Sequence, residues 1–91
     1  MLVCELTTYR SLPSPQIREE HIAYLRSAGT KGKVVLSGRF ADAKGALIIW
    51  RVNSLQEAEE LAKGDPYYRA GLIDYQLREW NLSLKFPENL E

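Results

Sequence analysis

Four short runs of this chain are rich in apolar, β-branched and aromatic residues, and most of them alternate between apolar and polar positions. The first is residues 2–8, where the alternation is loose. Residues 34–40 (VVLSGRF), 46–52 (ALIIWRV) and 72–82 (LIDYQLREWNL) follow, and residues 41–45 (ADAKG) have the composition of a hairpin turn. Such runs are typical of β-strands. The pattern therefore predicts four strands, with the middle two joined as a hairpin.

Between these runs, two stretches repeat their apolar residues at helical spacing instead. The first begins after Ser14, whose hydroxyl can cap free backbone N–H groups, and Pro15 suits the first helical position because it has no N–H. We expect Gly29 to end this helix. The second begins after Ser54, with Glu57 three residues later at the spacing of a capping box. The chain therefore predicts two amphipathic helices.

The predicted elements follow the order β-α-β-β-α-β, and this order defines a fold class. It is the split β-α-β, or ferredoxin-like, pattern of an α+β domain, with two helices on one face of a four-stranded antiparallel sheet. We expect one domain over residues 1–91. Its core is about residues 1–82, and residues 83–91 form a tail that is either a loose arm or a packing extension.

The third predicted strand is apolar on both of its faces. One face carries four apolar residues of the run 46–52, and the other carries Leu47 and Ile49. Two helices cover only one face of a sheet, so the second apolar face needs another cover. We favour a second copy of the chain, packed sheet on sheet about a twofold axis. The alternative is that Leu47 and Ile49 simply add to the apolar part of an ordinary surface.

Charge and composition narrow the classes of partner and compartment. The 12 Lys and Arg residues balance 12 Asp and Glu residues, which argues against a nucleic acid or an anionic membrane held by charge. No apolar run approaches ~20 residues, so we expect no membrane span, and the first residues lack a signal-peptide pattern. Because the single cysteine, Cys4, has no partner for an internal disulfide, we expect a cytoplasmic protein.

The chain has one histidine, His21, in the first predicted helix. It lies one turn after Ile17 and one turn before Leu25, so it borders the apolar face of that helix. One interpretation is a packed, hydrogen-bonded residue, and the other is a general acid or base that titrates near neutral pH. One histidine and one cysteine far apart give no zinc-ligand spacing, so we expect no metal site.

Ser37 and Gly38 end the second predicted strand. A glycine there can form a bulge or let a ligand approach the backbone, and the serine offers a hydroxyl and an N–H. The simpler interpretation, which the residues alone favour, is that the pair only ends the strand. The sequence contains no phosphate-cradling loop, dinucleotide fingerprint or nucleophile elbow.

Residues 64–74 (GDPYYRAGLID) link the second helix to the last strand and carry more polar and aromatic residues than a link needs. Asp65 can cap a short helical turn that Pro66 begins and Gly71 ends. The same carboxylate could instead hold the imidazole of His21 in one tautomer and raise its basicity. Spacing alone leaves both roles open.

Three short motifs occur in order along the chain: REEH at residues 18–21, LSG at residues 36–38 and GDPYYRAGL at residues 64–72. Together they resemble those of the YCII-related (YciI-like) family of small dimeric α/β-barrel proteins. The resemblance extends from the first strand to about Trp80, over a matching order of elements. It implies a ferredoxin-like protomer that pairs through its sheet, in agreement with the two-sided apolar strand.

The resemblance also implies a His–Asp pair in a pocket between helices and sheet, and here those positions are His21 and Asp65. The neighbouring substrate-binding positions would be Arg18, Ser37, the backbone of Gly38 and the ring of Tyr67. Where the family usually has proline after the second motif, this chain has Arg39, which should point to the same side as Ser37. Arg39 would either bind an anionic group of the substrate or extend into solvent.

Relatives with known activity shape the functional hypotheses. One is a dehydrochlorinase that removes HCl from a chlorinated hydroxyhydroquinone, and the wider superfamily includes a muconolactone isomerase. Both transfer protons on small cyclic compounds without a cofactor. The resemblance therefore favours a cofactor-free enzyme of lyase or isomerase type, with a His–Asp dyad acting on a small cyclic or phenolic compound. The alternatives are a non-catalytic dimer that binds or senses a small molecule, a purely structural dimer, and a cofactor-free oxygenase.

Overall fold

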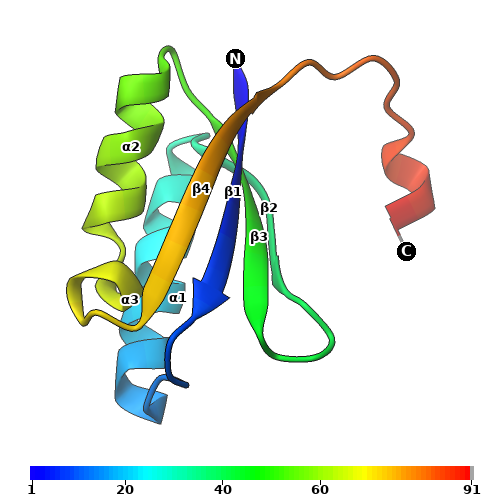
Figure 1. The fold of residues 1–91 in the computed structure, drawn as a ribbon. Coiled ribbons are helices and arrows are strands. Elements are labelled where there is room, and N and C mark those ends of the chain that lie inside the picture. The colour runs from blue at the N-terminus through cyan, green and yellow to red at the C-terminus, as the bar shows by residue number, and fades with distance from the viewer. Residues whose placement is uncertain (91) are drawn as a thin grey trace.

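Strands and helices follow the predicted order and form two layers (Figure 1). The computed structural model describes residues 1–90. The elements are β1 (Leu2–Tyr9), α1 (Pro15–Thr30), β2 (Val34–Arg39), β3 (Gly45–Arg51), α2 (Leu55–Gly64), α3 (Pro66–Arg69) and β4 (Ile73–Trp80). The strands are antiparallel in the order β2-β3-β1-β4, and the three α-helices lie on one side of the sheet. The predicted α+β, ferredoxin-like fold is confirmed.

Local hydrogen bonds start both long helices where the sequence predicts. The Ser14 hydroxyl accepts from the backbone N–H of Ile17 at 3.3 Å, and the Ser54 hydroxyl accepts from the N–H of Glu57 at 3.1 Å. The Glu57 carboxylate reaches back and accepts from the N–H of Asn53 at 2.8 Å. That donor lies one residue before the cap, so the capping box closes slightly earlier than its usual pattern.

Helix α1 continues past Gly29, which the sequence predicts as its end. It extends to Thr30, whose hydroxyl donates to the carbonyl of Arg26 at 2.8 Å. The chain turns at Gly32, whose φ of 77° lies in the left-handed region that glycine adopts without strain. Gly32 follows Lys31, the C-cap of α1. The glycine that ends the helix is therefore Gly32 and not Gly29.

Strand β1 lies in the middle of the sheet, and its alternate residues face the helices. Val3, Glu5 and Thr7 are buried, and Val3 lies opposite Trp50 of β3. The hydrophobic core between the sheet and the helices consists of Val3, Leu25, Ala28, Ile48, Trp50, Val52 and Ala58. A carboxyl group, that of Glu5, is therefore enclosed next to an apolar core.

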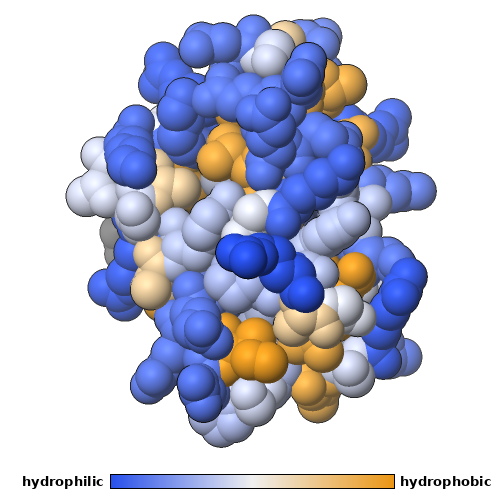
Figure 2. Space-filling model, turned by 90° about the vertical axis from the view of Figure 1, so that its left-hand side faces the viewer, coloured by the Kyte–Doolittle hydropathy of each residue, from blue (hydrophilic) through white to orange (hydrophobic). Residues whose placement is uncertain are grey.

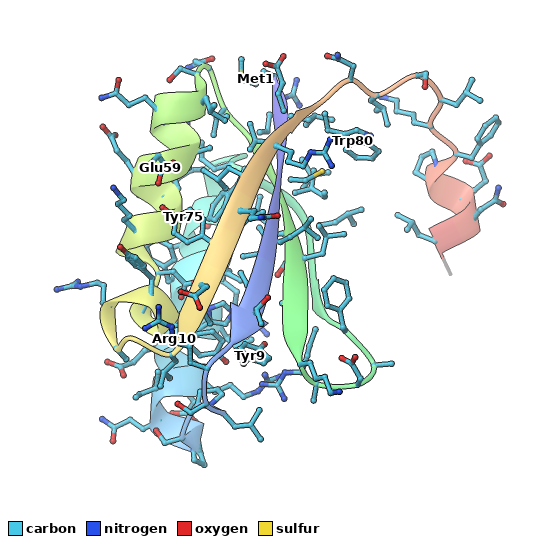
Figure 3. The ribbon with its side chains drawn as sticks, viewed as in Figure 1. Met1, Tyr9, Arg10, Glu59, Tyr75 and Trp80 are labelled. Atoms are coloured by element: carbon cyan, nitrogen blue, oxygen red, sulfur yellow. The ribbon has the colours of Figure 1, made fainter. Side chains whose placement is uncertain are left out.

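The opposite side of the sheet, its outer face, carries none of the α-helices of residues 1–90. Leu6, Leu36 and Trp80 on this face are 37%, 46% and 44% exposed. The strand register places them on the side of Leu47 and Ile49, and Figure 3 shows Trp80 at the end of β4, away from the helices. Strand β3 is therefore apolar on both sides, as predicted. Pairing of two copies over the outer face stays a prediction.

The predicted tail leaves β4 as an arm on the outer side of the sheet (Figure 1). It includes a short 3-10 helix at Pro87–Leu90. Leu84 and Phe86 of the arm line a hollow together with Leu36 of the outer face. The arm thus faces the apolar surface of the sheet. Glu91, the last residue of the predicted tail, lies outside the described residues.

The helix-covered side of the molecule has a mainly hydrophilic surface. Figure 2 views the molecule from this side and shows hydrophobic residues as small separate areas. The two sides of the sheet therefore differ, with large exposed apolar side chains on the outer face and along the arm. Across residues 1–90, we find no helix with the length and hydrophobicity needed to cross a membrane.

Gly45 at the start of β3 permits a close approach to β1, and this generates a prediction about stability. A Cβ at this position would lie 2.1 Å from the carbonyl oxygen of Thr7, which is backbone and cannot rotate away. Gly45→Ala should therefore lower the free energy of unfolding by about 1–3 kcal/mol, as overpacking does, measured by urea denaturation. Gly38→Ala is the matched control, because a Cβ there meets nothing within 4 Å. Equal losses in both variants would contradict the close approach.

Candidate functional site

His21 and Asp65 are joined by a buried hydrogen bond. The distance between His21 Nδ1 and Asp65 Oδ1 is 2.8 Å, across 44 positions of sequence. The side chains are 11% and 1% exposed. An ionised carboxylate can only accept a hydrogen bond, so Nδ1 carries the proton and Nε2 presents its lone pair. The structure thus brings together the two residues that the family resemblance pairs.

Asp65 is placed by two short elements that meet at it. It is both the C-cap of α2 and the N-cap of α3, in extended backbone conformation, and Pro66 begins α3. Its Oδ1 also accepts from the N–H of Tyr67 at 2.9 Å. One oxygen therefore serves both roles that the sequence left open, helix cap and partner of His21. The other oxygen, Oδ2, is buried and has no hydrogen-bond partner among the described residues.

Tyr67 holds the imidazole from its flat side. The rings of His21 and Tyr67 are stacked with centroids 3.7 Å apart and an interplanar angle of 5°. Tyr67 is 2% exposed, and its hydroxyl finds no partner within residues 1–90. The stacking and the bond to Asp65 together restrict rotation of the imidazole. The predicted aromatic residue of the site therefore lies against the histidine, and its role in ligand binding stays a prediction.

Tyr9 extends this group of rings to the surface and was not found from the sequence. It lies at the end of β1 (Figure 3) and packs edge-on against Tyr67, with centroids 6.0 Å apart at 79°. Arg39 Nε donates to the Tyr9 hydroxyl at 3.2 Å, and the guanidinium carbon lies 5.3 Å from the centre of the Tyr9 ring. The hydrogen bond to Tyr9 is the main cause that raises the pKa of Arg39. Tyr9 thus connects Arg39 to the stacked pair.

The other predicted residues lie on the exposed surfaces of α1 and β2. Arg18 is exposed on α1 and lines a shallow groove with Ile22 and Arg26. Ser37 is exposed at the edge strand, on the helix side by its register opposite Ile48. Gly38 is paired with Leu47 and so belongs to the outer face. In the described part of the chain, Arg18 and Ser37 form no hydrogen bond with the dyad, and their binding roles stay predictions.

Over residues 1–90, no group of three or more His, Cys, Asp or Glu residues is arranged to hold a metal ion. Cys4 is half-buried on the outer face, away from His21.

Glu5 is a second buried acid that the sequence analysis missed. It is 0% exposed, and its Oε1 accepts from the indole N–H of Trp50 at 2.9 Å. The pKa of Glu5 is raised to about 7, chiefly by burial; the Trp50 hydrogen bond opposes this shift, and the charges of Asp65 and Glu59 add to it. The alternation in residues 2–8 gives no signal for it, because Leu2, Cys4 and Leu6 form the more apolar set, whereas Val3, Glu5 and Thr7 face the helices in the folded protein.

Comparison with known proteins relates this structure to a family. A sequence model described as "YCII-related domain" matches residues 1–81. The "Uncharacterized protein YjpA" of Bacillus subtilis (strain 168) is 26% identical over 76 residues, which cover 79% of this chain and 89% of YjpA.

One solved structure is similar in fold. It is the 5-chloro-2-hydroxyhydroquinone dehydrochlorinase TftG from Burkholderia phenoliruptrix AC1100, in complex with 2,5-dihydroxybenzoquinone. The TM-score is 0.70 at 21% sequence identity, covering 91% of this chain and 96% of TftG. The likeness shows a shared fold. It agrees with the architecture that the order of elements predicts.

The burial of Glu5 predicts how stability depends on pH. Its pKa is about 7 in the folded protein and 4.5 when unperturbed. Between these values the unfolded chain loses a proton that the folded chain keeps, so the free energy of unfolding falls as pH rises from 4.5 to 7. The decrease due to Glu5 should be roughly 3 kcal/mol. Urea denaturation of the wild type and of Glu5→Gln, at several pH values, measures it. A difference between the two proteins that is constant with pH would contradict the raised pKa.

Proposed function

The chain belongs to the YCII-related family, and we propose that it is a cofactor-free enzyme whose His21–Asp65 pair transfers a proton on a small cyclic or phenolic compound. The buried 2.8 Å hydrogen bond between His21 Nδ1 and Asp65 Oδ1 carries this proposal. This bond occupies Nδ1 and leaves Nε2 as the ring nitrogen that takes up a proton from the substrate. A carboxylate on the opposite nitrogen stabilises the imidazolium that then forms.

In the proposed reaction His21 acts first as a general base. Nε2 removes a proton from the substrate, and Asp65 balances the positive charge that develops on the ring. Tyr67 keeps the imidazole plane fixed through its stacked contact, so little reorientation is needed before proton transfer. In an isomerisation the imidazolium would return the proton to another atom of the substrate. In an elimination the proton is lost together with a leaving group.

The position of Arg39 favours a substrate that is anionic or phenolic. Its guanidinium is held by Tyr9 at the outer end of the ring series that begins at His21. It forms no ion pair with a carboxylate within residues 1–90, so its remaining N–H groups are available to an oxyanion. Arg18 and Ser37 are the further donors that we propose for substrate binding. The dehydrochlorinase TftG, which acts on a chlorinated hydroxyhydroquinone, provides an example of such a compound on this fold.

A non-catalytic function is the second candidate, and the burial of the pair favours it. His21 is 9% exposed, and Asp65 already has a structural role as the cap of α3. The enclosed His21–Asp65 pair could bind the polar groups of a small molecule without catalysing a reaction. Binding of a chlorinated hydroquinone without chloride release or a new product by mass spectrometry would support this function over catalysis.

Substitution of the two residues tests the catalytic proposal. His21→Ala and Asp65→Asn should each lower kcat/KM by ~10²–10⁴-fold on any compound that the wild type converts. Chlorinated and hydroxylated hydroquinones are the compounds to screen, with chloride release and product masses as readouts. Asparagine at position 65 keeps an oxygen for the Tyr67 N–H, so the fold should persist. Gln56→Ala, on the exposed side of α2, is the control. Unchanged turnover in both dyad variants would rule out the mechanism.

We also propose that two copies of the chain pack through their outer faces. Leu6, Leu36 and Trp80 are exposed there without a covering helix. Large exposed apolar side chains on one face are typical of a protein–protein interface. An interface made from the same patch on both subunits is closed by a twofold axis, which gives a dimer.

A charge on the outer face tests the dimer. Leu6→Glu should raise the dissociation constant at least 10-fold, because two carboxylates would be buried across a twofold axis without partners. Sedimentation equilibrium measures this constant. Gln56→Glu adds the same charge on the exposed surface of α2 and should leave it unchanged. A wild-type protein that stays monomeric at all concentrations would contradict the pairing.

A further inference from the structure

Several acidic groups lie between the sheet and the helices, close to the dyad. Glu5 on β1 and Asp65 at the α2–α3 link are 0% and 1% exposed. Glu59 on α2 is partly exposed and is held by the hydroxyl of Tyr75, which donates to it (Figure 3). Within residues 1–90 no lysine or arginine forms an ion pair with Glu5 or Asp65. The interior therefore has more acid than it has positive charge to balance it.

Glu5 lacks the partners that a buried carboxylate needs. Oε1 accepts one hydrogen bond, from the indole of Trp50, and Oε2 is buried with no partner in the described chain. An ionised carboxylate in such a place is strongly disfavoured, because one neutral donor does not replace its hydration. A neutral acid satisfies the same geometry at lower cost. Its carbonyl oxygen accepts the indole N–H, which leaves the proton on Oε2.

Asp65 differs from Glu5 in its partners, although both are fully enclosed. Its Oδ1 accepts from the His21 ring and from the backbone N–H of Tyr67. Two donors, one of which can become cationic, favour the ionised form. The two acids are close enough for the charge of Asp65 to be one of the causes that raise the pKa of Glu5 to about 7. Negative charge is therefore favoured on Asp65 over Glu5.

We propose that Glu5 is a positioning residue for the dyad. In the resting protein Glu5 is a neutral acid, so Asp65 alone carries the negative charge that His21 faces. Ionisation of Glu5 adds a second negative charge. This inference deepens the proposed function and rests on it for its catalytic meaning. A second negative charge in the interior favours the imidazolium form of His21. A general base must be unprotonated to act, so ionisation of Glu5 would hold His21 in its inactive form.

The groups around Glu5 allow this coupling. The titratable or charged groups that interact with it from the surrounding elements are Tyr24 of α1, Glu59 of α2, Asp65 of the α2–α3 link and Tyr75 of β4. From β3 it meets Trp50, which does not titrate, and Tyr67 of α3 lies against His21. Burial, followed by the charges of Asp65 and Glu5, raises the pKa of Tyr24, so that hydroxyl stays neutral at these pH values. Lys63 pairs with Glu59 at 3.9 Å, and the two side chains are 57% and 45% exposed.

NMR titration of the intact protein tests the inference without a substrate. The chain has one histidine, so the ring Cε1–H signal reports His21 alone. The indole N–H signal of Trp50 reports the group to which it donates, Glu5. In the wild type we expect the Trp50 signal and the carboxyl ¹³C signal of Glu5 to titrate together near pH 7, and the His21 signal to show an inflection at the same pH. In Glu5→Gln, which keeps the acceptor for Trp50, the Trp50 step and this His21 inflection should both be lost.

Each outcome either supports or overturns the inference. Glu60→Gln removes a charge from the exposed surface of α2 and should preserve both signals. A Glu5 carboxyl ¹³C signal that does not titrate near pH 7 in the wild type overturns the neutral resting acid, even if the glutamine variant does not fold. A His21 titration that is identical in wild type and Glu5→Gln overturns the coupling. Loss of the coupling leaves the turnover test of His21→Ala and Asp65→Asn unaffected, so failure of this inference and failure of the proposed function are distinguishable.

Discussion

A single carboxylate oxygen, Asp65 Oδ1, accepts hydrogen bonds from the ring of His21 at 2.8 Å and from the backbone of Tyr67 at 2.9 Å. The first bond ties α1 to the link between α2 and α3, and the second starts α3. Helix α3 then places the Tyr67 ring against the imidazole. The cap of α3 and the His21–Asp65 pair therefore depend on the same oxygen atom. Loss of this oxygen would release the histidine, its stacking partner and the start of the helix together.

The register of the sheet decides which residues can reach this arrangement. Strand β1 is central, and its inward positions bring Glu5 and Tyr9 to the two ends of the site. Glu5 lies inside the protein near Asp65, and Tyr9 leads outward to Arg39. A shift of one residue in this strand would exchange the inward and outward sets and remove both. The site therefore depends on strand pairing as much as on the helices that carry the dyad.

Charge distribution in the interior distinguishes two kinds of buried acid. Asp65 has an imidazole and a backbone donor, whereas Glu5 has one indole donor and no cation within the described residues. Desolvation acts on both, and the two donors to Oδ1 offset it at Asp65 more than the single indole N–H does at Glu5. In our proposal Asp65 is the charged partner of His21, and Glu5 is the neutral acid of the same small core. The same difference makes the stability of the fold sensitive to pH through Glu5.

The sequence by itself determined the features that depend on neighbouring residues. Ser14, Ser54 and Asp65 cap helices because each side chain reaches an N–H two or three positions ahead. The order of these elements then leaves one compact antiparallel arrangement, and the short motifs indicated the family. Tertiary structure decided what depends on distant residues. The contact between His21 and Asp65 spans 44 positions, and Tyr9 and Glu5 became part of the site only through strand register. Local backbone preferences cannot set such contacts, because packing of the helices on the sheet fixes them.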